Sequence, residues 1–215
     1  MCKDDLLEEI LRVERLSKQF VKKYMLSSNI SMVKAVEDVS FSLYNGEVLV
    51  IAGESGSGKS TIAKLILGAI DSDSGEIFFE GKKSNDEPNI LKKIRMQCQM
   101  VYQDPYESIN PRMKVADIIS EPLEIHNIGD SLERKKIILD TLREVKLEPA
   151  EDIANKYPHM LSGGQRQRVV LARALVLRPK VIIADEPVSM LDVSIRAEIL
   201  ELMKEMQKKN NISFI

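Results

Sequence analysis

A glycine-rich segment at residues 53–61 constrains the fold of this chain more than any other feature. It reads Gly53-Glu54-Ser55-Gly56-Ser57-Gly58-Lys59-Ser60-Thr61 and fits the pattern of a phosphate-binding loop, or P-loop, between a buried strand and a helix. Glycines let backbone N–H groups approach phosphates closely, and the positive end of the following helix points at them. We therefore expect Lys59 to bridge the β- and γ-phosphates of a nucleotide and the Ser60 hydroxyl to bind Mg²⁺. A flexible Gly/Ser loop is the alternative, which the strand and helix context disfavours.

The bulk composition excludes several classes of protein. The chain has 215 residues, enough for one domain or one domain with an inserted lobe, and is 44% hydrophobic and 30% charged. Its net charge of -2 gives no overall basic field, so no nucleic-acid partner is predicted. Cys2 and Cys98 form neither a metal spacing nor a disulfide framework, which indicates a reducing cytosol. No signal peptide is seen, and the longest apolar run, Val48–Ala52, is too short to span a bilayer, so any membrane role is expected to come through a partner.

Periodicity predicts an α/β core. Strands are expected at residues 10–16, at Val39–Leu43, at Ile77–Phe79 and at Met96–Met100, with Val48–Ala52 as a buried parallel strand before the P-loop. A tight turn is expected at Asn45-Gly46. Further elements are a helix at 60–69, a helix from Gly163 to about Leu177, a buried strand at Val181–Ala184, an amphipathic helix containing Ile199, Leu202, Met203 and Met206, and a strand beginning at Asn211.

Residues 104–160 are expected to be mostly helical, with loops at Pro105, Pro111, Pro122 and Pro158. Asp130 with Glu133 predicts a capping box, and Ile138, Leu142 and Val145 then fall on one helical face. We therefore expect a core formed by residues 1–103 and 163–215, with a helical lobe inserted at about 104–162.

Two acidic residues follow the apolar strand at 181–184. In P-loop NTPases an Asp at a strand end, here Asp185, holds the Mg²⁺ shell. The neighbouring Glu186 is a candidate base for the proton of an attacking water. The alternative is a pair of carboxylates that simply ends a strand at the surface.

A second candidate anion site is Leu161-Ser162-Gly163-Gly164-Gln165. Ser162 is a natural N-cap, and two glycines expose several backbone N–H donors at a helix start. One chain has no need of two γ-phosphate sites for one ATP, which favours a loop that closes over the nucleotide of a partner. The alternative, an ordinary capped helix, stays open.

Taken together, these motifs resemble those of ATP-binding cassette (ABC) ATPases over nearly the whole chain. The matching segments, in order, are Gly53–Thr61, Gln103, Leu161–Gln165, Val181–Glu186 and Ser189-Met190-Leu191-Asp192. The resemblance implies a P-loop NTPase core with an N-terminal antiparallel β subdomain and the helical lobe. It also implies two subunits that sandwich two ATP molecules head to tail, with Mg²⁺.

The resemblance assigns roles to individual residues. It implies that Gln103 contacts Mg²⁺ and the attacking water and senses a membrane partner, and that Glu186 is the catalytic base. Ser162, Gly163, Gly164 and Gln165 would bind the γ-phosphate across the interface, and Asp192 would lie in the loop linking the two sites. An aromatic residue is expected to stack on adenine. Phe20 matches best and Tyr24 is the alternative, while an aromatic residue packed in a small sheet remains open.

The segment Val101–Arg112, which contains Gln103-Asp104-Pro105 and Asn110-Pro111-Arg112, looks like the oligopeptide/dipeptide/nickel importer branch of the family. Ala35–Phe41 fits that branch too. The branch implies an ATPase subunit on the cytoplasmic face of the membrane that works with permease subunits, a second homologous or identical ATPase subunit and, indirectly, an extracytoplasmic solute-binding protein.

The resemblance ends before one feature of the family. Members carry a switch histidine a few residues beyond the position of Ile215, and His126 and His159 lie in or beside the helical lobe. We therefore expect a fragment or truncated product, with slow hydrolysis if it is whole. Besides a peptide importer ATPase, two other functions are considered: a soluble ABC ATPase acting on DNA or ribosomes, and a nucleotide-binding regulatory module without turnover.

Overall fold

The computed structural model describes residues 8–23, 30–84 and 88–215, and Tyr24 lies outside them. The chain divides into two compact units. Unit 1 is Met1–Arg95 together with Ile215, and unit 2 is Met96–Phe214. Each unit is described by itself.

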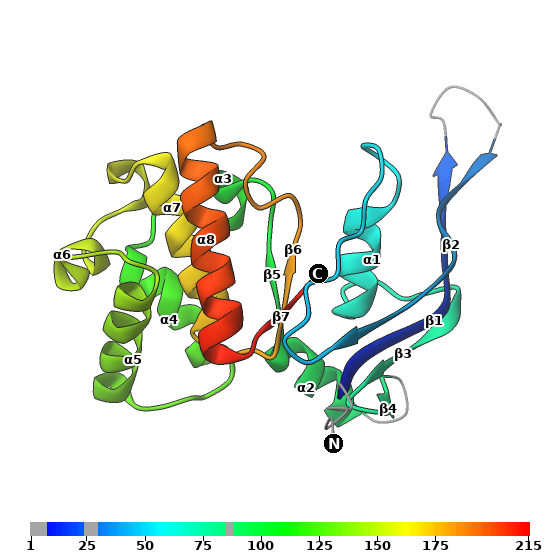
Figure 1. Cartoon of the computed structure of the whole chain (residues 1–215), viewed down its shortest axis with the longest axis horizontal. Helices are drawn as coiled ribbons and strands as arrows, with labels where there is room; N and C mark the ends of the chain where they lie inside the picture. Colours follow the sequence, from blue (N-terminus) through cyan, green and yellow to red (C-terminus); the bar gives the residue numbers. More distant parts are fainter. Residues whose placement is uncertain (1–7, 24–29, 85–87) are drawn as a thin grey trace, which may run out of the picture. The chain divides into compact units, whose positions relative to one another are not determined.

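Unit 1 is built on an antiparallel sheet with the strand order β2-β1-β3-β4 (Figure 1). Its strands are β1 (Glu9–Lys23), β2 (Ile30–Tyr44), β3 (Ser74–Phe79) and β4 (Lys82–Lys83). The alternation predicted for residues 10–16 is confirmed, because Leu11, Val13 and Leu16 are buried. The predicted turn at Asn45-Gly46 follows β2 directly.

Helix α1 (Lys59–Ile66) begins at the end of the P-loop and packs its apolar side into unit 1. Ile62, Ala63, Leu65 and Ile66 are its buried residues, as the spacing of an amphipathic helix requires. Helix α2 (Pro88–Gln97) follows β4.

The predicted buried strand at Val48–Ala52 is wrong for the structure described. Val48 makes an isolated bridge, residues 49–54 have no regular structure, and Val48 and Val50 are 50% and 78% exposed. An all-apolar strand becomes buried between parallel neighbours, and the strands of the sheet in unit 1 pair antiparallel.

Unit 2 is built on a parallel sheet with the strand order β5-β6-β7. The strands are β5 (Cys98–Val101), β6 (Val181–Ala184) and β7 (Ser213–Phe214), and β6 in the middle is buried at its first three residues. The buried apolar run predicted for Val181–Ala184 is therefore confirmed. Helices α7 (Gly163–Leu175) and α8 (Val193–Asn210) lie beside this sheet in Figure 1.

The remaining helices of unit 2 lie between β5 and α7 in the sequence. They are α3 (Pro105–Ser108), α4 (Val115–Ile125), α5 (Ser131–Glu144), α6 (Ala150–Ala154) and the short 3₁₀ helix η1 (Pro158–Met160). The capping box predicted for Asp130 and Glu133 opens α5. The boundaries 104–162 of the helical lobe stay a prediction.

The loop predicted at Pro122 is wrong, because Pro122 lies inside α4. A proline there removes one helical hydrogen bond and costs about 3 kcal/mol. The same helix buries Ile118, Ile119 and Leu123, which contribute roughly 1.5–3 kcal/mol each, so packing outweighs the local penalty.

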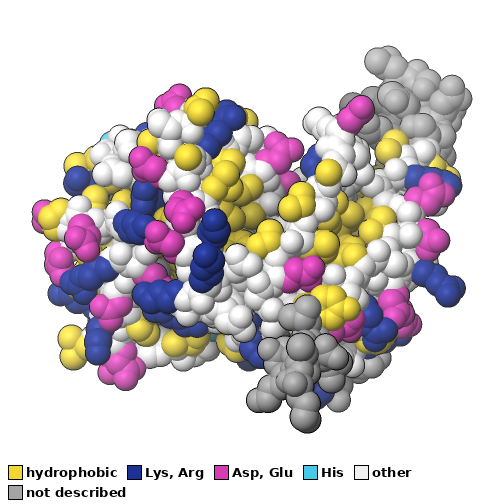
Figure 2. Space-filling view, in the orientation of Figure 1, with side chains coloured by type: hydrophobic (Ala, Val, Ile, Leu, Met, Phe, Trp, Pro, Cys, Tyr) yellow, Lys and Arg dark blue, Asp and Glu magenta, His cyan; other side chains and the backbone are white. Residues whose placement is uncertain are grey.

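The α/β fold class with an N-terminal antiparallel sheet is thus confirmed. On the face of unit 2 seen in Figure 2, acidic and basic side chains are interspersed, in keeping with a net charge near zero. Within the described residues, no helix is both long and apolar enough to cross a membrane.

Candidate functional site

The P-loop contains a position, Gly58, whose backbone conformation and close neighbours favour glycine. Gly58 is the N-cap of α1 with φ of 98° and ψ of 3°. A Cβ added there would lie 1.9 Å from the carbonyl oxygen of Ala35 in β2. Gly56 also has a positive φ, 81°, but a Cβ there meets nothing within 4 Å. The loop can therefore present its backbone N–H groups at the start of α1 only because Gly58 brings it against β2.

The Lys59 side chain lies over the same loop. Its Nζ donates to the carbonyl oxygens of Gly53 at 2.7 Å and Glu54 at 2.9 Å. Ser55, Gly56, Ser57 and Ser60 are exposed, and Thr61 is half-buried. An ammonium group, exposed hydroxyls and the N–H groups at a helix start are the donor set that a Mg²⁺–triphosphate requires, so these residues fit the nucleotide predicted from the sequence.

Phe20 lies near the end of β1, where it pairs with Val33 of β2, and the residue is 41% exposed. The Nζ of Lys18 lies 5.8 Å from the ring centroid and also donates to Asp73 Oδ1 at 2.8 Å. The hydrogen bond from Lys18 lowers the pKa of Asp73 below its ordinary value of 3.8, with a further contribution from the N–H of Gln19. An exposed aromatic ring beside a fixed cation suits stacking on a base.

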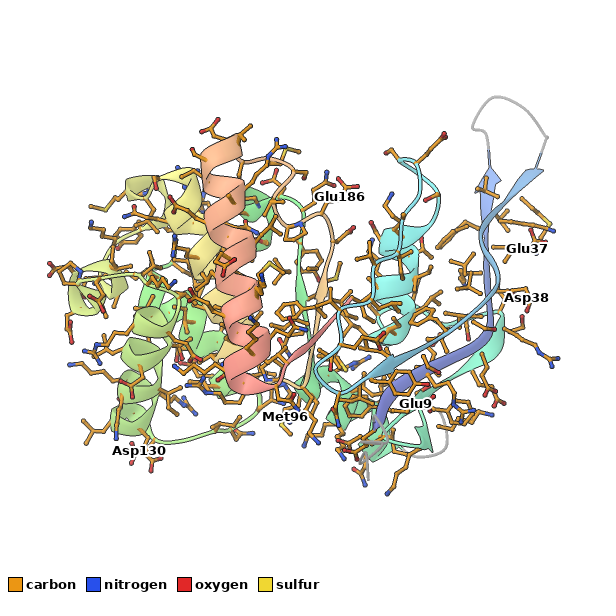
Figure 3. The ribbon with its side chains drawn as sticks, in the orientation of Figure 1. Glu9, Glu37, Asp38, Met96, Asp130 and Glu186 are labelled. Carbon is orange, nitrogen blue, oxygen red and sulfur yellow. The ribbon has the colours of Figure 1, made fainter. Side chains whose placement is uncertain are left out.

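In unit 2, two of the predicted catalytic residues meet at the ends of neighbouring strands. Gln103 follows β5 and Glu186 follows β6, and Gln103 Nε2 donates to Glu186 Oε2 at 3.2 Å. The backbone N–H of Asp185 donates to the carbonyl of Val101 at 2.9 Å, which continues the strand pairing to this edge. Figure 3 shows Glu186 just beyond β6. The carboxyl ends of parallel strands therefore bring these side chains together, as in other open α/β sheets.

The backbone turns sharply at Glu186. Its φ is 46°, in the left-handed region, and its carbonyl accepts hydrogen bonds from Ser189 N at 3.1 Å and Ser189 Oγ at 3.0 Å. The next carbonyl, that of Pro187, accepts from Gln167 Nε2 at 2.6 Å. Sequence reasoning missed Gln167. It lies three, four and seven residues before the buried Val170, Leu171 and Ala174 and therefore on the same face of α7. A polar residue on an apolar helix face was the sequence signal that could have identified it.

The second predicted anion site is the N-terminus of α7. Ser162 Oγ accepts from Gln165 N at 3.3 Å and Gln165 Oε1 accepts from Ser162 N at 3.1 Å, which is a capping box. Ser162 and Gly163 are exposed, and a Cβ on Gly164 would lie 2.9 Å from Ile195 Cγ2. The helix cap is thus confirmed, and binding of a partner's phosphate stays a prediction.

Asp192 is the exposed N-cap of α8 and makes no capping hydrogen bond with its side chain. Its neighbours Met190 and Val193 are 64% and 79% exposed. Single exposed apolar side chains are normal on a protein surface, so the role of Asp192 in a loop between two sites stays a prediction.

The structure divides the predicted site residues between its units. Phe20 and the P-loop belong to unit 1, whereas Gln103, Ser162–Gln165, Asp185, Glu186 and Asp192 belong to unit 2. In the part of the chain that is described, no group of three or more His, Cys, Asp or Glu side chains forms a metal cluster. A cavity of about 480 Å³ among α4, α5 and α6, lined by residues such as Asp117 and Arg134, contains none of the predicted site residues.

Known proteins are similar to this sequence over almost its whole length. The ABC transporter family model matches residues 36–189. The probable peptide ABC transporter ATP-binding protein y4tS of Sinorhizobium fredii is 44% identical over 210 residues, which are 97% of this chain and 59% of that protein. The oligopeptide transport ATP-binding protein OppF of Bacillus subtilis is 43% identical over 97% of this chain and 67% of its own length. The chain thus spans less than two thirds of the first of these relatives.

A solved structure agrees with the fold. The dimeric, post-hydrolysis state of the ATP-binding cassette MJ0796, bound to ADP and Pi, matches with a TM-score of 0.78 and 31% identity. The match covers 95% of this chain and 86% of that one.

Proposed function

The chain belongs to the ABC transporter family. We therefore propose that it is an ATP-hydrolysing subunit that drives the import of peptides through partner permeases. One observation carries this proposal: the similarity to ATP-binding proteins of peptide and oligopeptide transport extends over 97% of the chain, through every motif assigned above. The P-loop geometry supports the ATP-binding part of it.

The proposed roles follow from chemistry at each residue. The N–H groups of Gly53–Thr61 and the Lys59 ammonium neutralise the phosphate oxygens, and Phe20 stacks on adenine. Ser60, Gln103 and Asp185 would hold Mg²⁺, which would supply positive charge to offset the charge of the phosphates.

Glu186 accepts the proton of the attacking water. The water oxygen bonds to the γ-phosphorus while the bond to the β–γ bridging oxygen breaks, and ADP leaves with that oxygen. Gln103 donates to Glu186 Oε2 and so orients the carboxylate toward the water.

We further propose that the active form is a head-to-tail dimer with an identical or homologous subunit. The exposed Ser162 and Gly163, with Gly164 and Gln165, close over the partner's γ-phosphate, and Asp192 joins the two sites. The dimer works at the cytoplasmic face of the membrane on permease subunits that receive solute from an extracytoplasmic binding protein. Closure on ATP and opening after hydrolysis then turn chemical energy into movement.

Glu186→Gln tests this function. The amide cannot accept the proton, so we expect Mg-ATP turnover to fall by at least roughly 100-fold while ATP binding persists, and the variant to form an ATP-bound dimer. Turnover by phosphate release, nucleotide affinity by calorimetry and size by chromatography measure the three effects. Cells that make this variant with the permeases should lose uptake of a labelled peptide.

Glu201→Gln is the matched control, because it removes one carboxylate from an exposed position on α8. It should leave turnover and uptake unchanged. A Glu186→Gln protein that hydrolyses ATP like the parent, or that stays monomeric in saturating Mg-ATP, would contradict the proposed mechanism.

A further inference from the structure

The turn that carries Glu186 needs support from outside its own segment. A non-glycine residue with φ in the left-handed region costs about 1 kcal/mol or more, so such a conformation persists where neighbours fix it. At Glu186, with φ of 46°, the two hydrogen bonds from Ser189 close the turn locally. Neither of these bonds anchors the turn to the rest of unit 2.

The side chain of Gln167 provides such an anchor. It is fully buried at 0% exposure on α7, twenty residues before its partner, and its Nε2 donates to the Pro187 carbonyl at 2.6 Å. Within the described residues its Oε1 has no hydrogen-bond partner. Burying an amide with one unsatisfied atom is unfavourable, so an apolar side chain would serve packing better at this position.

Helix α7 connects this anchor with the second predicted anion site. The helix begins at Gly163, four residues before Gln167, which is a rise of about 6 Å along the axis. Arg166, next to Gln167, donates to the carbonyls of Pro158 at 2.8 Å and Leu161 at 2.9 Å, which fixes the segment leading to Ser162. One rigid helical turn therefore bears both the Ser162 loop and the contact with the turn of Glu186.

We propose that Gln167 is a positioning residue that holds the Glu186 turn in its catalytic conformation and links it to the α7 end that meets a partner's nucleotide. The inference deepens the proposed ATPase function and rests on it. Gln167 acts through Pro187 and Glu186 and does not contact the reacting atoms. Binding of a partner at Ser162 then affects, through one turn of α7, the orientation of the Glu186 carboxylate in the same chain.

Gln167→Met tests the proposal in the full chain. Methionine has a similar length and fills the space, but it cannot donate to Pro187. We expect kcat for Mg-ATP to fall by about 10- to 100-fold through misplacement of Glu186, while the ATP dissociation constant changes by less than about twofold. The amides of Ser189 and Leu191, which bond back to Glu186 and Val188, should exchange faster with deuterium.

Thr141→Val is the matched control. Thr141 is also fully buried in unit 2, and its Oγ1 donates to the carbonyl of Ile137 at 2.7 Å, within α5. Valine removes one buried hydrogen bond of the same kind at nearly constant shape. It should lower the melting temperature while kcat and exchange in the Glu186 turn remain those of the parent.

The two readouts separate this proposal from the one on which it rests. Unchanged exchange at Ser189 and Leu191 in Gln167→Met overturns the positioning role, as does faster exchange with an unchanged kcat. If the parent chain does not bind Mg-ATP, the ATPase proposal fails, yet faster exchange in Gln167→Met still supports Gln167 as the anchor of the turn.

Discussion

At the scale of single residues, the backbone of β2 determines what can stand at Gly58. The φ of 98° disfavours any side chain, and the Ala35 carbonyl oxygen occupies the place that a Cβ would need, 1.9 Å away. The obstacle is backbone, so no rotamer change relieves it. The P-loop and β2 must separate if Gly58 is replaced.

Gly58→Ala should therefore weaken ATP binding by at least roughly tenfold and destabilise the protein by about 3 kcal/mol or more, the upper range for a strained φ plus a steric clash. Gly81→Ala is the control, because Gly81 has a φ of 72° but a Cβ there meets nothing within 4 Å. It should cost about 1 kcal/mol and leave ATP binding intact. Urea unfolding and calorimetric ATP titration measure both effects, and equal losses in the two variants would contradict the role of the Ala35 contact.

The sequence predicts some site residues better than others because of where their partners lie. The P-loop is local, so its glycines and Lys59 are evident from nine consecutive residues. Gln103 and Glu186 are 83 residues apart, and only the pairing of β5 with β6 brings their side chains within 3.2 Å. Gln167 was missed because its partner is a backbone carbonyl, which leaves no mark in the sequence at Pro187.

At the scale of elements, the Glu144 carboxylate connects the C-terminal ends of α5 and α8 in unit 2 through a hydrogen bond. Glu144 closes α5 and its side chain is 10% exposed. Its Oε1 accepts from Asn210 at the end of α8 at 2.6 Å, and its Oε2 accepts from Arg178, which follows α7. Burial opposes ionisation of Glu144, but the hydrogen bonds from Asn210 and Arg178 outweigh it and lower its pKa below the ordinary value of 4.5.

The lowered pKa of Glu144 determines the sign of its contribution to the pH dependence of stability. A carboxyl whose pKa is lower in the folded state stabilises the fold above pH 4.5, and the contribution is lost as the pH falls from there through the folded-state pKa. Glu144→Gln should destabilise the protein by about 1–2 kcal/mol at pH 7, as for a charge-assisted hydrogen bond, and by less as the pH falls below 4.5.

Chemical unfolding of parent and variant at several pH values measures the difference. Glu205→Gln is the control, because Glu205 pairs with Lys146 at the surface, where both side chains are about half exposed, 47% and 54%. Its effect should stay below about 1 kcal/mol. A Glu144→Gln penalty that grows toward acid pH would contradict the assignment.

Elements were predictable from the sequence where burial and local signals agree. The alternation in β1, the capping box of α5 and the apolar run of β6 all have the expected structure. Pro122 shows the opposite case, since the packing of α4 overrides a local helix breaker. Val48–Ala52 reads as a buried strand, but burial of such a run depends on parallel neighbours that its own sequence does not specify.

At the scale of the whole molecule, the chain carries two separate loops for which we propose a role in anion binding. The P-loop opens α1 in unit 1, and the Ser162 loop opens α7 in unit 2. In the proposed dimer each ATP lies between the P-loop of one subunit and the Ser162 loop of the other. A defect in the P-loop and a defect in the Ser162 loop would then affect the two sites of a mixed dimer unequally.

Mixing two inactive variants tests this arrangement. Lys59→Ala removes the P-loop ammonium, and Gly163→Asp places a carboxylate at the exposed start of α7, where it repels phosphate. In a dimer of one variant with the other, one site combines both defects and the second site has neither. Random pairing of equal amounts makes half of the dimers mixed, so turnover should recover to roughly a quarter of the parent rate, from nearly none in each variant alone. A site completed within one chain would leave every site with one defect, so a mixture no more active than its separate components would refute the head-to-tail dimer.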